Sequence, residues 1–254
     1  MKHFLSKLKK RNGLLYWYGW FCFLGALACL IMTQVSSTMV LGINAYIKPM
    51  KFFLSIALFC WTMGWYMEYL KERGKVRVYS WMVVLAMCYE LFVITWQAAN
   101  GRLSHFNIST PLYRMLFVGM GAAISLLVGW TGYIGYLFFR QKSFSVPMPY
   151  VWGIRLGIIL FVVFSFEGGL MASHLAHTVG APDGGPGIVL FNWSRDHGDL
   201  RIAHFIGVHA LQALPIFGYY STKSNRVVQV VTVLYFAMTV LLFLQAIRGL
   251  PLIR

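Results

Sequence analysis

Histidine is the residue type with the clearest potential for chemistry in this sequence, because neutral imidazole binds transition metals and haem iron. Six of the seven histidines fall near residue 105 or between residues 174 and 209. We predict a cofactor site formed by His105, His174, His177, His204 and His209, of which the last four are also candidate metal ligands. The cofactor expected from these residue types is haem b or a transition metal, namely iron, copper or zinc.

The spacing of the histidines limits which of them can bind the same metal ion. If both lie on one helix, His174 and His177 are about 60° apart and share a face. His204 and His209 are about 140° apart and do not. A single metal ion is therefore expected to take only one of His204 and His209.

Two of the seven acidic residues, Glu90 and Glu167, lie well inside apolar stretches. Intramembrane carboxylates are costly and usually face the protein interior or a wet cavity. Glu167 should share a helical face with His174 and lie deep enough to meet His209, and Glu90 should form a similar stripe with Gln97. We therefore predict catalytic roles for Glu90 and Glu167.

Arg201 is the third predicted catalytic residue. It follows Asp199, which is well placed to cap the helix that begins there. Its guanidinium group would then be available to an anionic group or to a carboxylate partner.

These residues also have a structural interpretation. A histidine at a helix end commonly lies at the membrane interface or binds a loop. A carboxyl group in a membrane helix is often protonated or hydrogen-bonded to a neighbouring helix. The functional interpretation is favoured by convergence, since three helices and two loops direct polar groups to one side.

The elements that must position these residues are transmembrane helices. The chain of 254 residues is 59% hydrophobic and 11% charged, whereas soluble domains are roughly 25% charged. Stretches of about 20 apolar residues can cross the hydrocarbon core as helices. We predict an all-α integral membrane protein, a single bundle of about seven helices at residues 14–32, 50–70, 79–98, 112–138, 151–173, 201–220 and 227–247.

The basic residues predict the orientation of these helices. The formal charge of +15 arises from small groups of Lys and Arg between apolar spans rather than from a basic face, so nucleic acid is not an expected partner. With a cytoplasmic N-terminus, fourteen of the 22 Lys and Arg residues fall on the cytoplasmic side. The positive-inside rule therefore favours a multi-pass protein of the cell membrane with its N-terminus cytoplasmic and its C-terminus extracytoplasmic.

The longest connecting segment, residues 174–200, should lie on the extracytoplasmic side together with the histidines. It contains Ala181-Pro182-Asp183-Gly184-Gly185-Pro186-Gly187, which favours a tight, irregular path. Long loops in compact proteins are commonly functional or disordered. We expect this one to fold back as a lid on the mouth of the bundle.

Three functions fit these features. The first is membrane redox chemistry at haem b or a transition metal, with the lipid bilayer and a small lipophilic substrate or quinone as partners. The second is a zinc-dependent hydrolase of a lipid-like substrate. The third is a proton-coupled transporter or solute-binding protein that uses Glu90 and Glu167.

The hydrolase alternative can be compared with a known family. Ser104-His105 together with His204 and His209 resembles in outline the metal motifs of the seven-helix alkaline ceramidase-like hydrolases. The spacing of His204 and His209 is i,i+5, however, whereas i,i+4 would place two ligands on one helical face. The pattern therefore departs from that family at its metal ligands.

Overall fold

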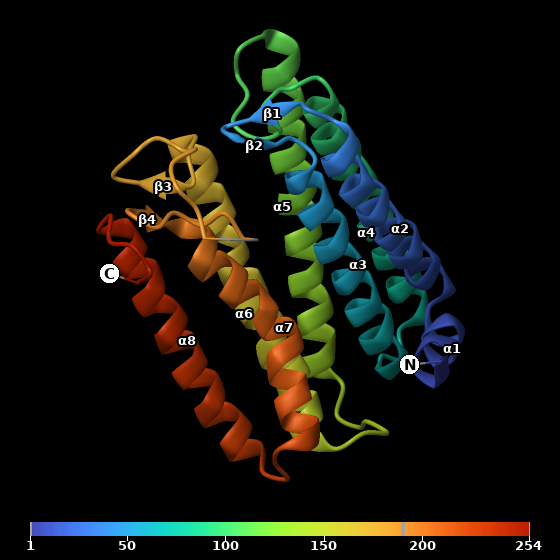
Figure 1. Ribbon diagram of the computed structural model, residues 1–254. Helices are drawn as coiled ribbons and strands as arrows, with labels where there is room; N and C mark the ends of the chain where they lie inside the picture. Colours follow the sequence, from blue (N-terminus) through green and yellow to red (C-terminus); the bar gives the residue numbers. More distant parts are fainter. Residues whose placement is uncertain (1, 189–190, 254) are drawn as a thin grey trace. The chain divides into compact units, whose positions relative to one another are not determined.

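The structure is a computed structural model that describes residues 2–188 and 191–253, and its main elements are helices (Figure 1). Eight α-helices occur in this described part, and seven of them are long and apolar enough to cross a membrane, which confirms the expected spans. They are α1 (Lys2–Arg11), α2 (Gly13–Val35), α3 (Ile47–Tyr66), α4 (Arg73–Ala99), α5 (Pro111–Arg140), α6 (Met148–His174), α7 (Leu200–Tyr220) and α8 (Asn225–Ile247).

Short elements occupy some of the connections. Strands β1 (Met39–Val40) and β2 (Ile43–Asn44) form a hairpin between α2 and α3, and the 3-10 turn η1 (Met67–Tyr69) follows α3. Strands β3 (Thr178–Val179) and β4 (Gly198–Asp199) pair antiparallel between α6 and α7. The long segment after α6 is thus closed at its base by a two-stranded ladder.

The chain divides into two compact units, Met1–Trp130 and Thr131–Arg254, and each is described by itself. The N-terminal unit contains α1 to α4, and the C-terminal unit contains α6 to α8. Helix α5 contributes its first part to one unit and its last part to the other.

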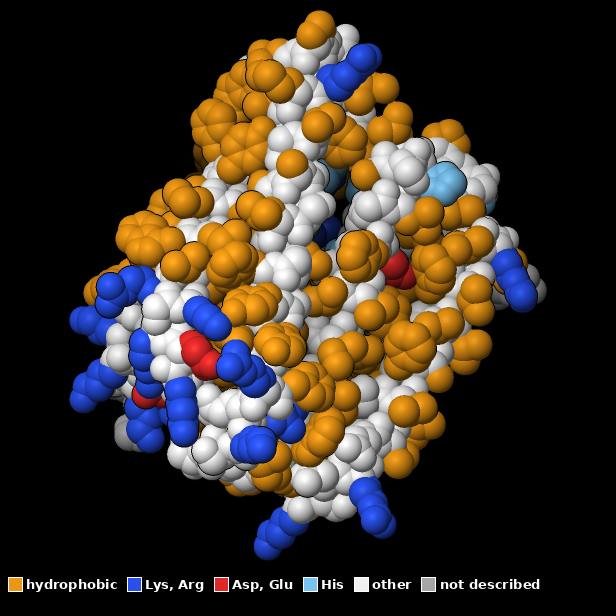
Figure 2. Space-filling model, turned by 180° about the vertical axis from the view of Figure 1, so that it is seen from behind, with side chains coloured by type: hydrophobic (Ala, Val, Ile, Leu, Met, Phe, Trp, Pro, Cys, Tyr) orange, Lys and Arg blue, Asp and Glu red, His pale blue; other side chains and the backbone are white. Residues whose placement is uncertain are grey.

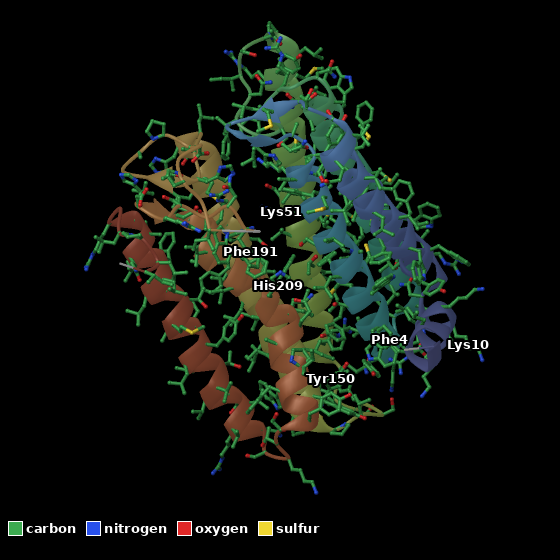
Figure 3. The ribbon with its side chains drawn as sticks, viewed as in Figure 1. Phe4, Lys10, Lys51, Tyr150, Phe191 and His209 are labelled. Carbon is green, nitrogen blue, oxygen red and sulfur yellow. The ribbon has the colours of Figure 1, made fainter. Side chains whose placement is uncertain are left out.

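The N-terminal unit begins with a basic helix packed against the end of α3. Phe4 of α1 stacks on Trp65 at 4.7 Å between ring centroids, and the Arg11 guanidinium carbon lies 3.7 Å from the centroid of the same ring. Asn12 then caps α2 by accepting a hydrogen bond from the Leu15 amide at 3.1 Å. Lys10 points away from the helices in Figure 3, and Figure 2 shows Lys and Arg side chains gathered at this end of the unit.

The C-terminal unit is built on the contact between α6 and α7. Leu160 and Phe164 of α6 and Ala210 and Leu214 of α7 form its buried apolar cluster. Helix α8 joins them through Tyr235, whose hydroxyl donates to the Ile206 carbonyl oxygen at 2.6 Å.

Apolar side chains cover the flanks of the helices in both units (Figure 2). Phe21, Phe92, Val233 and Leu241, for example, are all more than half exposed. Exposed apolar surface along helices of this length is what contact with lipid requires. The chain is therefore a helical multi-pass membrane protein.

Candidate functional site

Glycines bring α6 and α7 of the C-terminal unit into close contact. A Cβ atom on Gly153 would lie 2.6 Å from the Leu214 carbonyl oxygen, and one on Gly157 would lie 2.8 Å from the Ala210 carbonyl oxygen. Backbone atoms cannot yield as a flexible side chain can, so these positions suit glycine alone. The two glycines are four residues apart and share a face of α6, the spacing by which membrane helices approach closely.

This contact places His204 against α6. Gly207 packs on the Phe164 ring so closely that a Cβ atom would overlap it, and His204 lies one turn earlier in α7. His204 Nδ1 is 2.8 Å from the Phe164 carbonyl oxygen. Because a carbonyl oxygen can only accept, Nδ1 carries the proton and Nε2 keeps its lone pair. His204 is therefore held in the tautomer that binds a metal through Nε2.

His209 lies further along α7 and has different neighbours. Its Nδ1 is 3.1 Å from the side-chain oxygen of Gln212, which again leaves Nε2 as the accepting nitrogen. Its ring meets Phe205 edge-on at 4.3 Å between centroids. Phe205 in turn contacts Phe191 and Trp193, which stack on each other at 4.5 Å. His209 thus borders an aromatic cluster that joins α7 to the preceding segment.

Glu167 is buried in α6 without the partner expected for it. The residue is 7% exposed, and neither carboxyl oxygen has a hydrogen-bond partner in the part of the chain that the structure describes. Glu167 therefore has no hydrogen bond to His209, whose Nδ1 lies next to Gln212, and their meeting at similar depth stays a prediction. A buried carboxyl group with no partner is costly when ionised, so it favours the protonated form or a nearby cation.

His177 is bound by Asp183 within the segment after α6. His177 Nδ1 lies 2.6 Å from Asp183 Oδ2, and the Thr178 amide donates to Oδ1 of the same carboxylate at 2.9 Å. Burial acts to raise the pKa of Asp183, but the hydrogen bonds and the charge of His177 outweigh it and hold the pKa well below its usual range. The pair fastens the start of the segment to its glycine-rich turn.

His174 and His177 do not share a helical face. Helix α6 ends at His174, which is exposed, because Leu175 adopts a left-handed conformation with φ of 52°. His177 lies beyond this helix end, next to β3. The expected 60° relation assumed a helix that continues through both residues.

Asp199 caps α7 as expected and also binds Arg201. Its Oδ1 accepts from the Arg201 amide at 3.0 Å and from Arg201 Nε at 2.9 Å. Arg201 Nη2 donates to Asp199 Oδ2 at 2.5 Å and to the Asn192 carbonyl oxygen at 2.6 Å. Of the two kinds of partner expected for Arg201, the structure contains the carboxylate. Arg201 ties the long segment to the start of α7.

The polar stripe expected on the third span is present in the N-terminal unit. Gln97 of α4 is fully buried, donates to the Ser104 carbonyl oxygen at 3.3 Å and accepts from Asn107 Nδ2 at 2.7 Å. Glu90, on the same face, is 3% exposed, and its Oε1 has no hydrogen-bond partner among the described residues. Gln97 thus shapes the connection that contains His105.

His105 belongs to the N-terminal unit, whereas the other four predicted cofactor ligands belong to the C-terminal unit. His105 Nδ1 lies 3.1 Å from Ser104 Oγ, and its ring lies 5.3 Å from the Phe52 ring. Its convergence with the other histidines stays a prediction.

No group of three or more His, Cys, Asp and Glu side chains that could hold a metal ion occurs within residues 2–188 and 191–253. The described site instead presents single imidazoles with fixed tautomers. No protein-family model, curated protein or solved structure matches the chain. The function is therefore inferred from the contacts within the molecule.

Two groups that orient the histidines were not expected from the sequence. Asp183 carried a signal, because aspartate in a Pro-Asp-Gly turn often accepts hydrogen bonds from nearby backbone amides. The Phe164 carbonyl carried none, since every residue has a carbonyl group. Only the close approach of α7 at Gly207 singles it out.

Proposed function

We propose that the protein binds haem b through His204 and carries out redox chemistry in the membrane. The observation that supports this is the 2.8 Å contact between His204 Nδ1 and the Phe164 carbonyl oxygen. It leaves Nε2 unprotonated, so His204 would hold the haem iron through that nitrogen. A hydrogen bond from the far nitrogen also fixes the ring and raises the basicity of the ligand. Haem, when bound, supplies a reversible one-electron carrier.

The donor set favours haem over a metal held by protein alone. Zinc sites take three or four protein ligands, and other transition metals are similarly coordinated. Haem iron needs only one or two axial side chains. His204 and His209 would each offer one nitrogen, on sides of α7 about 140° apart, so they do not suit one small ion together. The zinc hydrolase stays an alternative that would require ligands from elsewhere.

The proposed electron partner is a lipid-soluble quinol. Its oxidation to the quinone releases two electrons, taken one at a time, and two protons. Glu167 is suited to relay these protons, because its buried carboxyl oxygens have no hydrogen-bond partner in the described part of the chain. Arg201, engaged by Asp199, would act by holding the segment over α7 in place.

The test is the haem content of the purified protein. Membranes from cells supplied with a haem precursor should give a protein with a Soret band and about one iron porphyrin per His204 site. His204→Ala should lose this absorbance, whereas His174→Ala, at the exposed end of α6, should keep it. Equal haem content in both variants, or a colourless wild-type protein from haem-replete cells, overturns the assignment.

Proton-coupled transport is a second proposal, favoured by the unpartnered carboxyl groups. Both oxygens of Glu167 and one of Glu90 are buried without a described hydrogen-bond partner. Such groups in transmembrane helices commonly mark proton pathways. This proposal needs Glu167 to exchange a proton, whether or not His204 binds haem.

The proton proposal is tested by infrared difference spectra recorded across a pH titration in lipid. The carbonyl band of a protonated carboxyl group should shrink in Glu167→Gln. Glu68→Gln provides the control, because Glu68 is a surface residue paired with Arg73 at 2.9 Å. A band unchanged by Glu167→Gln means that Glu167 does not titrate, which contradicts the proton role.

We also propose a cell-membrane location with a cytoplasmic N-terminus and an extracytoplasmic C-terminus. Support comes from the distribution of basic residues, fourteen of 22 on the proposed cytoplasmic side. The segment between α6 and α7 would then face outward and serve as the lid of the site.

A further inference from the structure

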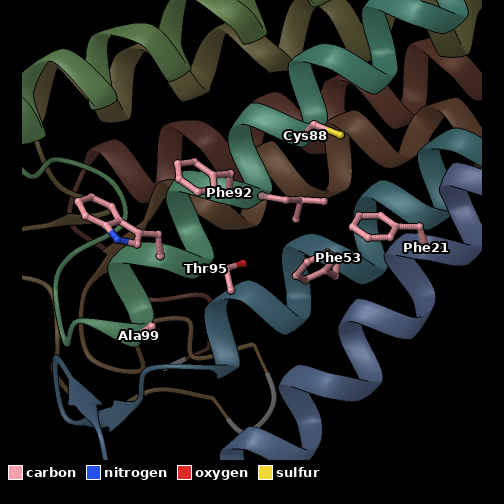
Figure 4. A pocket seen from close by; sticks show the side chains of 8 residues that line it. Phe21, Phe53, Cys88, Phe92, Thr95 and Ala99 are labelled. Carbon is pink, nitrogen blue, oxygen red and sulfur yellow. The ribbon is translucent and has the colours of Figure 1, made fainter.

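A groove of about 440 Å³ opens between α2, α3 and α4 of the N-terminal unit (Figure 4). Its volume lies in the range of small-molecule sites, roughly 300–1,000 Å³. No charged residue lines it. Four aromatic side chains, one thiol and one hydroxyl provide its main contacts, from Phe21, Phe53, Phe92, Trp96, Cys88 and Thr95.

Thr95 differs from four other Ser and Thr residues in the helices of this chain. A hydroxyl in a helix interior commonly donates to the carbonyl four residues earlier. Four others do so at 2.6–2.8 Å, namely Ser80, Ser165, Thr232 and Thr239. Thr95 Oγ1 is buried and has no hydrogen-bond partner in the described part of the chain. Its hydroxyl lies on the groove side of α4 (Figure 4).

The groove is reached from the lipid. It extends along α4 from Ala99, the last residue of the helix, to Cys88, about 16 Å further into the span. Phe21 and Phe92 on its border are 56% and 62% exposed on the apolar flank of the unit. Glu90 lies about 160° around α4 from Cys88 and so faces away from the groove. The lining and the position of the groove therefore suit a neutral molecule dissolved in the membrane.

We infer that this groove binds an isoprenoid quinone, with its ring among the aromatic side chains and one ring carbonyl accepting a hydrogen bond from Thr95. Aromatic rings stack on a planar quinone, and a hydroxyl donor matches its carbonyl acceptor. A saturated acyl chain would leave Thr95 unpaired, and a phospholipid headgroup would find no charge. The inference gives the quinol partner of the proposed function a site, and rests on that function only for the partner's role.

Cys88 offers a built-in probe of occupancy. It is exposed and lines the groove, whereas Cys22, Cys29 and Cys60 are buried. The full-length protein in phosphatidylcholine nanodiscs is treated with a membrane-permeable maleimide, and the rate of Cys88 modification is measured by mass spectrometry against added decylubiquinone. Decylubiquinone should protect Cys88 in a saturable way, and hexadecane should not. Equal protection by hexadecane overturns the inference.

Substitutions at Thr95 distinguish a hydrogen bond to the quinone from apolar packing around it. Thr95→Val should raise the half-protecting concentration of decylubiquinone about fivefold to tenfold, the loss of one hydrogen bond. Thr95→Ser, which keeps the hydroxyl, and Thr239→Val, which removes a hydroxyl already bonded within α8, should both protect as the wild type does. Unchanged protection in Thr95→Val, or equal loss in Thr95→Val and Thr95→Ser, contradicts the role of the hydroxyl.

The His204→Ala variant separates this inference from the haem proposal. Protection of Cys88 should persist in that variant, because the groove and His204 belong to different units. Saturable protection without haem would support the quinone site while the haem proposal fails. Haem binding without protection would overturn the quinone site alone.

Discussion

His204 and His177 each make a hydrogen bond through Nδ1. The acceptor of His204 does not titrate, whereas the acceptor of His177 does. His204 donates to the Phe164 backbone carbonyl, which does not titrate. His177 is bound to the Asp183 carboxylate, which does. At the residue scale, the orientation of His204 should therefore not depend on pH, whereas the hydrogen bond between His177 and Asp183 should persist in mild acid and weaken only below pH 3.8.

The Asp183 tie predicts how the segment between α6 and α7 responds to substitution. Asp183→Asn removes the negative charge that binds His177. The side chains of His177 and Asp183 are only 17% and 16% exposed, so water screens their interaction weakly. Local opening of the segment should become easier by about 1.5–3 kcal/mol, the usual value for a hydrogen bond to a charged group. Hydrogen exchange at the His177 and Thr178 amides measures this. Asp196→Asn, at an exposed position of the same segment, should leave exchange unchanged.

The pH dependence of the same tie has a definite sign. The pKa of Asp183 is lowered from its ordinary 3.8, so its stabilising contribution is complete above pH 3.8 and is lost as the pH falls below that value. Exchange protection of the Thr178 amide, corrected for intrinsic rates, should fall in that acid range in the wild type. In Asp183→Asn the corrected protection should be low and independent of pH. An unaltered acid response in the variant would contradict the assignment.

At the element scale, the sequence indicated the spans well and their contacts poorly. Length and hydropathy are local properties, so all seven spans could be placed to within six residues at each end. The cap at Asp199 was also readable, because a capping aspartate acts on neighbouring amides. The approach of Gly207 to Phe164 was not, since it depends on which helices pair. The burial of Glu167 could be expected from its place in an apolar span, but the absence of a hydrogen-bond partner for it among the described residues could not.

The glycine contact between α6 and α7 should be sensitive to one added methyl group. In Gly157→Ala the new Cβ atom would meet the Ala210 carbonyl oxygen at 2.8 Å and Leu211 Cα at 3.2 Å. Overpacking of this kind destabilises by about 1–3 kcal/mol. Unfolding in detergent by denaturant titration measures the loss.

Gly169→Ala is the matched control for this substitution. Gly169 lies in the same helix, but a Cβ atom there would have nothing within 4 Å. Alanine is the better helix former by about 1 kcal/mol, so Gly169→Ala should be neutral or stabilising. Equal stability of the two variants would mean that α6 and α7 do not pack through Gly157.

At the scale of the whole molecule, the side of the membrane that each connection faces decides where the proposed histidine site opens. Reporter fusions at Arg73 and Pro186 test this. Arg73 precedes α4 and should be cytoplasmic, and Pro186 lies between α6 and α7 and should be extracytoplasmic. The opposite result at both positions would place the histidine segment on the cytoplasmic side. It would also contradict the orientation inferred from the distribution of Lys and Arg.

The most direct test of the central claim is chemical rescue of the His204 ligand. His204→Gly removes the imidazole that donates to the Phe164 carbonyl oxygen, and free imidazole added during haem reconstitution can take the vacated place. The haem bound per protein should fall in His204→Gly and return when imidazole is added. His209→Gly, the control, should not lose haem and regain it with imidazole in this way. Undiminished haem in His204→Gly without imidazole, or no haem in the wild type after reconstitution, would contradict the account.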